Sequence, residues 1–218
     1  MDKGASIARC CNDLFFKTLK LLDFVILKLF FSFEIKNVNH IPVSNSFIVT
    51  ANHFSFMDPP VLQAACPRRI IFFMTEKYYN PIWSRWFFKA MHCIPLREDS
   101  HYHIAALKSG IKLLKEGQVI GIFPEGEISR NGEIQDGRPG TLLLSQKTNF
   151  PIVPAFISGT YQALPRHAKF FQKAKIKVVF GDPLYFNDLS NGLKGKKGLE
   201  QATKNLIQTF RDLAKTQE

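Results

Sequence analysis

His53 and Asp58 are the two residues of this sequence whose types and spacing best suit acid–base chemistry. An imidazole titrates near neutral pH and can remove a proton from a hydroxyl, while a carboxylate on its other nitrogen fixes the tautomer and stabilises the imidazolium. On one straight helix the two side chains would point roughly 140° apart, at ~100° per residue, so only a turn can bring them together. The pair therefore suits a general base and the residue that orients it.

The sequence around this pair predicts a strand, a turn and a helix. An apolar run, Phe47–Ala51, has the composition of a buried strand and leads directly into Asn52 and His53. Asp58 followed by Pro59 is also typical of a helix N-cap with proline at the first helical position. Capping and catalysis can coexist in one residue, so the two interpretations of Asp58 are compatible.

No residue of the chain has the sequence context of a protein nucleophile. The Gly-x-Ser-x-Gly pentapeptide of serine hydrolases does not occur. The four cysteines lack pairwise spacing, which indicates a reducing compartment without disulfides, and none has a convincing nucleophile setting. The nucleophile would then belong to the substrate: His53 would deprotonate an acceptor hydroxyl, which attacks an activated acyl group. This is the chemistry of a transferase.

Two further segments place polar residues at the end of an apolar strand. Val119–Phe123 runs into Pro124–Arg130, and Cys93–Leu96 ends at Arg97, which could bind a phosphate or carboxylate with two hydrogen bonds. Ligands of open α/β sheets collect outside the strand ends, so we expect the polar clusters to share one cleft. Taken singly, Pro-Glu-Gly is also an ordinary turn sequence and Arg97 could be a solvated surface charge.

The order of apolar runs along the chain predicts an α/β fold. Strands alternate with helical stretches, which favours a largely parallel or mixed central sheet covered by helices. The predicted strands lie at about residues 47–51, 70–74, 93–96, 119–123, 152–157 and 176–180.

In combination, these segments resemble the lysophosphatidic acid acyltransferase family, the 1-acylglycerol-3-phosphate acyltransferases. The resemblance covers about residues 35–187, and the four family motifs occur in the family's order. They are Asn-His-x4-Asp at Asn52–Asp58 with its usual Ser55, an apolar strand closing on arginine at Ile94–Arg97, Phe-Pro-Glu-Gly at Phe123–Gly126, and an apolar run around Pro154.

The resemblance implies acyl transfer from a thioester of acyl carrier protein or coenzyme A to the free hydroxyl of a lysoglycerolipid. The favoured acceptor is 1-acylglycerol-3-phosphate, which gives phosphatidic acid, and no cofactor or metal is expected. By motif position, His53 would be the general base and Asp58 its orienter. The acceptor's head group would be held by Arg97, Phe123, Glu125, Gly126, Ser129 and Arg130. Support of the loops would come from Asn52, Ser55, Pro124 and Pro154.

One departure from the family pattern concerns the acceptor. Many members have Thr-Arg after Phe-Pro-Glu-Gly, whereas this chain has Glu127 and Ile128. The change removes a cation that favours a phosphate and adds an anion. Either Arg130 compensates, or the acceptor is another lysophospholipid with less exposed charge. Arg138, where the family often has the lysine of Lys-x-Gly, keeps a basic group.

The composition fits one globular domain with attached segments. The chain has 218 residues, of which 45% are hydrophobic, enough for a substantial core. We expect a membrane-association segment at 1–36, a catalytic domain at 37–190, and a basic hinge with a C-terminal amphipathic helix at 191–218. The helix, predicted over 199–214 after a solvated hinge at 191–198, would either cap the sheet or touch lipid.

The N-terminal segment Leu14–Phe33 has the apolar density of a membrane segment, but Lys17, Lys20, Asp23 and Lys28 interrupt it. No charge-free stretch approaches the ~18 residues of a spanning helix. The three lysines fall within about 80° on a helical wheel, which favours an amphipathic helix lying in the membrane interface. The alternative is a helix packed on the protein's own core. A secretory signal is not expected, because the apolar stretch is repeatedly charged.

The net charge of +11 predicts an anionic partner. An anionic membrane surface or an acidic carrier protein fits, whereas nucleic acid is not expected, because the basic residues are dispersed and no nucleic-acid-binding signature occurs. We expect a peripheral or monotopic protein on the cytoplasmic face of a membrane. A catalytically idle lipid-binding protein on the same scaffold, or a thioesterase with water as acceptor, are the alternatives.

Overall fold

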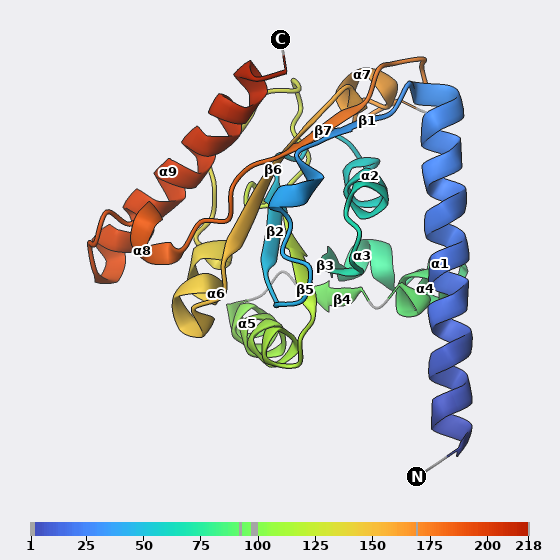
Figure 1. Ribbon diagram of the computed structural model, residues 1–218, viewed down its shortest axis with the longest axis horizontal. Coiled ribbons are helices and arrows are strands. Elements are labelled where there is room, and N and C mark those ends of the chain that lie inside the picture. The colour runs from blue at the N-terminus through green and yellow to red at the C-terminus, as the bar shows by residue number, and fades with distance from the viewer. Residues whose placement is uncertain (1–2, 92, 97–99, 169, 218) are drawn as a thin grey trace.

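The computed structural model describes residues 3–91, 93–96, 100–168 and 170–217. Within these ranges one sheet of seven strands forms the centre of the molecule (Figure 1). The strands are β1 Glu34–Lys36, β2 Ile48–Ala51, β3 Ile70–Thr75, β4 Ile94–Leu96, β5 Val119–Ile122, β6 Ile152–Ser158 and β7 Lys177–Phe180, in the spatial order β1-β7-β6-β2-β5-β3-β4.

The sheet is mixed, and most of its neighbouring strands are parallel. β2 lies between β5 and β6 and is parallel to both, with Val49 opposite Gly121 and Val153. Only β6 and β7 pair antiparallel among the described strands, so β7 and its parallel neighbour β1 run against the others. The predicted α/β fold with a largely parallel or mixed sheet is therefore confirmed, whereas β1 was not predicted.

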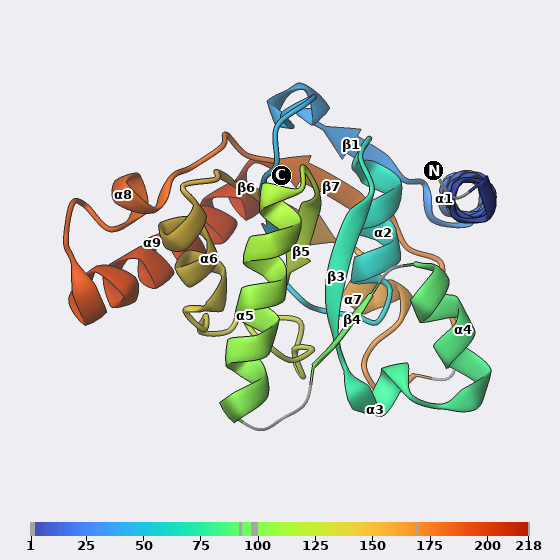
Figure 2. The same ribbon diagram turned by 90° about the horizontal axis from the view of Figure 1, so that it is seen from below.

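Helices cover both faces of the sheet (Figures 1 and 2). The helices α1, α2 and α7 lie on one side, and α5, α6, α8 and α9 lie on the other. Their bounds are α1 Lys3–Phe31, α2 Asp58–Ala65, α3 Glu76–Tyr79, α4 Ile82–Ala90, α5 Ser100–Lys115, α6 Gly140–Thr148, α7 Thr160–Ala163, α8 Phe186–Leu189 and α9 Gly195–Lys215, with a short 3-10 helix at Val38–His40.

Each face of the sheet has its own core, because successive strand residues point to opposite faces. In β2, Val49 belongs to the cluster that includes Leu62 of α2 and Leu27 of α1. Its neighbour Ile48 belongs to the cluster that includes Phe210 of α9. Strands buried on both faces read as continuous apolar runs, which is why the sequence predicted β2, β5 and β6 well.

The N-terminal helix α1 packs on the domain, which is one of the two arrangements that the sequence left open. Phe16, Leu27 and Phe31 are buried against the domain, whereas Leu29 and Phe30 are exposed. Among the described residues, no helix is both long enough and apolar enough to cross a bilayer. The helix therefore packs on the domain along one side and leaves an apolar side uncovered.

The C-terminal helix α9 covers the sheet, one of its two expected positions. It begins at Gly195, so the second half of the predicted hinge at 191–198 is helical. Leu206 and Phe210 are fully buried, and Gln217 beyond its end donates to the carbonyl of Phe156 in β6 (3.2 Å).

We expect Phe210→Ala to lower the free energy of unfolding by about 3–5 kcal/mol, because truncating a fully buried phenylalanine leaves a cavity under α9. Urea unfolding followed by circular dichroism measures this. Arg211→Ala, one position along on the exposed side of the same helix, is the control and should change stability by less than about 0.5 kcal/mol. Equal losses in both variants would contradict the assigned packing of α9.

Candidate active site

The structure brings His53 and Asp58 together on the turn between β2 and α2. His53 Nδ1 lies 2.9 Å from Asp58 Oδ2. The Asp58 side chain is fully buried, and that of His53 is 15% exposed. Because Nδ1 faces the carboxylate, Nε2 is the ring nitrogen left to face a substrate.

Asp58 also holds the turn that carries His53. Its Oδ2 accepts hydrogen bonds from the backbone N–H groups of Phe54 (2.6 Å) and Ser55 (2.7 Å). The predicted N-cap role is wrong: Met57 is the N-cap, and Asp58, the first residue of α2, binds amides that precede it in the chain. Three N–H donors converge on one oxygen when Nδ1 carries its proton, so the carboxylate fixes both the loop and the ring.

Two polar side chains attach this turn to the rest of the domain. The Asn52 side chain donates to the carbonyl of Ile157 (2.9 Å) and accepts from its N–H (2.7 Å), which extends the pairing of β2 with β6 by one residue. Ser55 Oγ donates to the carbonyl of Leu164 (2.7 Å) and accepts from the N–H of Met57 (3.2 Å). Both side chains are buried and therefore act on the shape of the loop.

The segment after β5 meets the histidine loop, as the sequence predicted from the two strand ends. Glu125 Oε1 accepts from the N–H of His53 (2.8 Å), and Oε2 accepts from the N–H of Gln135 (3.0 Å). The N–H of Ser129 donates to the carbonyl of His53 (2.8 Å). Both Glu125 oxygens are thus engaged by backbone amides, and the residue is 4% exposed, so it joins three loop segments.

The pKa of Glu125 is raised to about 7, mainly because burial disfavours the charged carboxylate. The two amide hydrogen bonds from Gln135 and His53 partly offset this effect, and the nearby Asp58 charge adds to it. Glu125 therefore places a carboxyl group with a pKa near neutral beside the His53 loop.

Phe123 and Gly126 shape the wall of the site. The Phe123 ring stacks on the His53 ring with centroids 4.2 Å apart and planes 18° apart, and on its other side it stacks on Phe72 at 5.9 Å. Gly126 has a φ of +79°, and a Cβ atom there would lie 2.9 Å from Nε of Arg138. Only glycine fits that position without strain.

The two predicted support prolines lie at the strands on either side of β2, Pro124 shortly after the end of β5 and Pro154 within β6. Pro124 is buried, and its carbonyl accepts from the N–H of Arg138 (2.7 Å). Pro154 lies in β6 opposite Thr50, and its carbonyl accepts from the N–H of Gly181 (2.8 Å).

The remaining predicted head-group residues are not equally placed for binding. Ser129 Oγ is fully buried and bonds within its own loop, to the carbonyl of Glu133 (2.9 Å) and to Asn131 Oδ1 (3.1 Å). Arg130 is exposed, while its carbonyl accepts from the Tyr161 hydroxyl (3.2 Å). Arg97 lies outside the described residues.

Glu127 and Ile128, where this chain departs from the family pattern, both contact Arg166, which the sequence did not predict. Glu127 forms an ion pair with Arg166 (3.5 Å), and the Arg166 Nη1 also donates to the carbonyl of Ile128 (3.1 Å). The Ile128 side chain is 8% exposed. Arg166, which comes after α7, thus supplies a positive charge beside Glu127.

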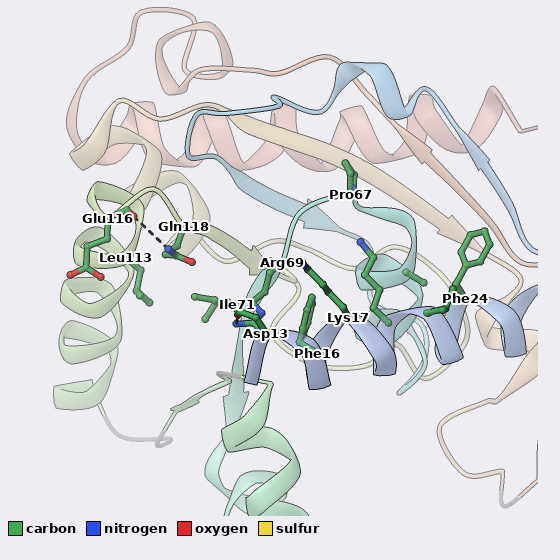
Figure 3. Close-up of a pocket in the computed structure, with 13 residues that line it drawn as sticks. Asp13, Phe16, Lys17, Phe24, Pro67, Arg69, Ile71, Leu113, Glu116 and Gln118 are labelled. Carbon is green, nitrogen blue, oxygen red and sulfur yellow. Dashed lines mark hydrogen bonds and ion pairs between the residues drawn. The ribbon is translucent and has the colours of Figure 1, made fainter. Parts of the chain in front are cut away.

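A separate cavity of about 830 Å³ opens at the opposite ends of the strands (Figure 3). It lies between α1, the start of β3 and the end of α5, where Arg69 pairs with Asp13 (3.2 Å) and covers the Phe16 ring (4.1 Å from guanidinium carbon to centroid). None of the predicted site residues lines it. The described part of the chain also contains no group of three His, Cys, Asp or Glu side chains placed to hold a metal ion.

The raised pKa of Glu125 predicts a pH-dependent stability. The folded protein holds this proton more tightly than the unfolded chain, so the contribution is fully present below pH 4.5 and is lost as the pH rises to about 7. We expect the unfolding free energy of the wild type, relative to Glu125→Gln, to fall by on the order of 3 kcal/mol across that range. Urea unfolding at several pH values measures it, and parallel curves for the two proteins would contradict it.

Comparisons with known proteins show the family to which the chain belongs. Residues 32–158 match the family model described as Acyltransferase. The chain is 29% identical over 190 residues to a 1-acyl-sn-glycerol-3-phosphate acyltransferase of Bacillus subtilis, covering 87% of this chain and 92% of that protein. It is 26% identical to a chloroplast 1-acyl-sn-glycerol-3-phosphate acyltransferase of Arabidopsis thaliana, with 72% of this chain covered but only 44% of that protein.

A solved structure has the same fold. The crystal structure of the 1-acyl-sn-glycerophosphate acyltransferase PlsC from Thermotoga maritima superposes with a TM-score of 0.77 at 22% identity, covering 96% of this chain and 83% of that one. The family match spans more than half of the chain and includes the histidine turn and the segment after β5. The chain therefore belongs to the acyltransferase family and is an enzyme of that family, as its resemblance to the lysophosphatidic acid acyltransferases predicts.

Proposed function

We propose that the protein transfers an acyl chain from a thioester of acyl carrier protein or coenzyme A to the free hydroxyl of a lysoglycerolipid. The favoured acceptor is 1-acylglycerol-3-phosphate, the substrate for which the relatives are named, and the product is phosphatidic acid. The observation that carries the proposal is the 2.9 Å contact between His53 Nδ1 and the buried Asp58 carboxylate.

In the proposed reaction, His53 Nε2 removes the proton of the acceptor hydroxyl as its oxygen attacks the thioester carbon. Asp58 stabilises the imidazolium that forms. When the tetrahedral intermediate collapses, the carbon–sulfur bond breaks and the proton on the imidazole passes to the leaving thiolate. A general base of this kind contributes ~10²–10⁴-fold, and positioning both substrates in one site supplies several kcal/mol more.

The described side chains support direct transfer without an acyl-enzyme. The hydroxyl of Ser55 donates to the Leu164 carbonyl, and the hydroxyl of Ser129 bonds within its loop. Burial raises the pKa of the Cys66 thiol, and it raises that of Cys93 to about 12, so neither supplies a thiolate at neutral pH. The acceptor hydroxyl is then the nucleophile.

The contacts around Glu127 favour a second acceptor class. Glu127 neutralises part of the Arg166 charge beside the site, and the buried Ile128 supplies no cation. A lysophospholipid whose phosphate carries a further head group is a phosphodiester with a single negative charge. Its binding site would therefore need fewer basic residues than the site of a phosphate monoester. Arg130, exposed on the same loop, is the group that we assign to the phosphate of 1-acylglycerol-3-phosphate.

We infer that the protein attaches to an anionic membrane surface, on the cytoplasmic side, through α1. The outward side of this helix carries a set of exposed apolar side chains that fall within about 180° of one another at ~100° per residue. They are Leu14, Phe15, Leu21, Leu22, Val25, Ile26, Leu29 and Phe30. A helix with such a side lies in the plane of the interface, and the net charge of +11 adds attraction to anionic lipid.

We expect His53→Ala to fold normally and to lose at least about 100-fold of acyl transfer, because the general base is gone while binding remains. Product mass and thiol release, measured with one acyl thioester and 1-acylglycerol-3-phosphate, give the two readouts. His167→Ala is the control, since His167 is exposed and lies outside the catalytic turn. Retained transfer by His53→Ala would remove His53 from its proposed role.

The same assay separates the alternatives to a transferase. A thioesterase would release thiol at the same rate without added lysolipid. A catalytically idle lipid-binding protein would release no thiol with any acceptor, even though it bound lysolipid vesicles.

A panel of lysolipid acceptors offered with one thioester donor tests the acceptor class. We expect the highest kcat/KM with 1-acylglycerol-3-phosphate, and a further few-fold gain for that acceptor in Glu127→Gln, because the change releases the Arg166 cation. Glu200→Gln on α9 is the control, as it changes the net charge equally away from the site. A higher kcat/KM with lysophosphatidylethanolamine would assign the enzyme to the second acceptor class.

A further inference from the structure

The loop between α7 and β7 exposes two large aromatic side chains. Phe170 is 81% exposed and Phe171 is 64% exposed. The sequence from Pro165 to Ile176 contains five basic residues, with histidine counted, and no acidic residue. Exposed aromatic rings flanked by basic residues are typical of segments that enter a lipid interface.

This loop lies against the C-terminal end of α1 (Figure 1). The Phe171 ring meets the Phe31 ring edge to face, with centroids 6.0 Å apart, and the N–H of Ile176 donates to the carbonyl of Phe31 (3.0 Å). Leu29 and Phe30, on the last turn of α1, are 75% and 65% exposed. The aromatic pair and the exposed Leu29 and Phe30 thus lie at the same end of α1, where Phe171 packs on the buried Phe31.

The base of the same loop is attached to the candidate active site. The carbonyl of Leu164 accepts from Ser55 Oγ in the histidine turn, and Arg166 donates to the carbonyl of Ile128 in the segment after β5. Phe170 comes six positions after Leu164, and six residues span at most about 20 Å. A membrane surface that Phe170 enters would therefore lie within about 20 Å of Leu164, which is bonded to the histidine turn.

We propose that Phe170 and Phe171 form a second membrane-inserting element, which enters the bilayer interface beside α1 and places the active site next to the lipid from which the acceptor comes. The inference rests on the proposed attachment of α1 to a membrane. The occupant is a lipid surface because the two exposed rings lie at the same end of α1 as the exposed Leu29 and Phe30, and because Lys173, exposed on the same loop, complements anionic head groups.

A matched pair of substitutions tests this element. Phe170→Asp places a charge on the loop, and Leu193→Asp places the same charge on a 46% exposed leucine just before α9. The helix α9 lies across the molecule from α1 (Figure 1). Binding to vesicles of phosphatidylcholine and phosphatidylglycerol is measured by sedimentation. Thermal unfolding and thiol release with a short-chain, monomeric 1-acylglycerol-3-phosphate serve as readouts that need no membrane.

We expect Phe170→Asp to bind vesicles at least about tenfold more weakly than wild type, because it removes an aromatic ring that would be buried in the lipid interface. Leu193→Asp should bind like wild type. The unfolding midpoint and the turnover of monomeric acceptor should not change in either variant. Equal vesicle binding by all three proteins would overturn the loop inference and leave the attachment of α1 standing. Absence of vesicle binding by the wild type would overturn the loop inference and the attachment of α1 together. A changed unfolding midpoint in Phe170→Asp would overturn the loop inference by showing that Phe170 has a structural role.

Discussion

One carboxylate oxygen organises the catalytic turn. Asp58 Oδ2 lies within hydrogen-bond distance of the ring of His53 and of the two backbone N–H groups that follow it. A buried charge is expensive unless donors surround it, so the turn and the carboxylate stabilise each other. The same contacts that fold the loop thus orient the imidazole.

The second constraint is the buried Glu125, which ties the loop after β5 to the loop after β2. Each of its oxygens accepts from a different backbone segment, one at His53 and one at Gln135. Burial opposes the charge that these bonds favour, and the result is a pKa of about 7. A group whose pKa lies in the neutral range therefore connects the two halves of the site.

Much of the fold and the local part of the site could be predicted from the sequence. The strands buried on both faces form unbroken apolar runs, and the His53–Asp58 contact spans one short turn. The antiparallel pairing of β6 with β7 could not be predicted, because periodicity does not give strand direction. The partners of Glu125 also could not, because its carboxylate meets amides brought together only by the folded loops.

The orientation of α1 shows why a helical wheel alone was insufficient. The wheel placed Lys17, Lys20 and Lys28 on one side, the side expected to face water. In the structure Lys20 donates to the carbonyl of Cys66 and Lys28 to that of Phe33 (2.6 Å), so two of these lysines reach toward the domain. Phe16, Leu27 and Phe31 pack on the domain, whereas Leu29 and Phe30 lie on the outward side. Because large exposed apolar patches are typical of interaction sites, the packing of α1, rather than the wheel, identifies the side of the helix that a partner would meet.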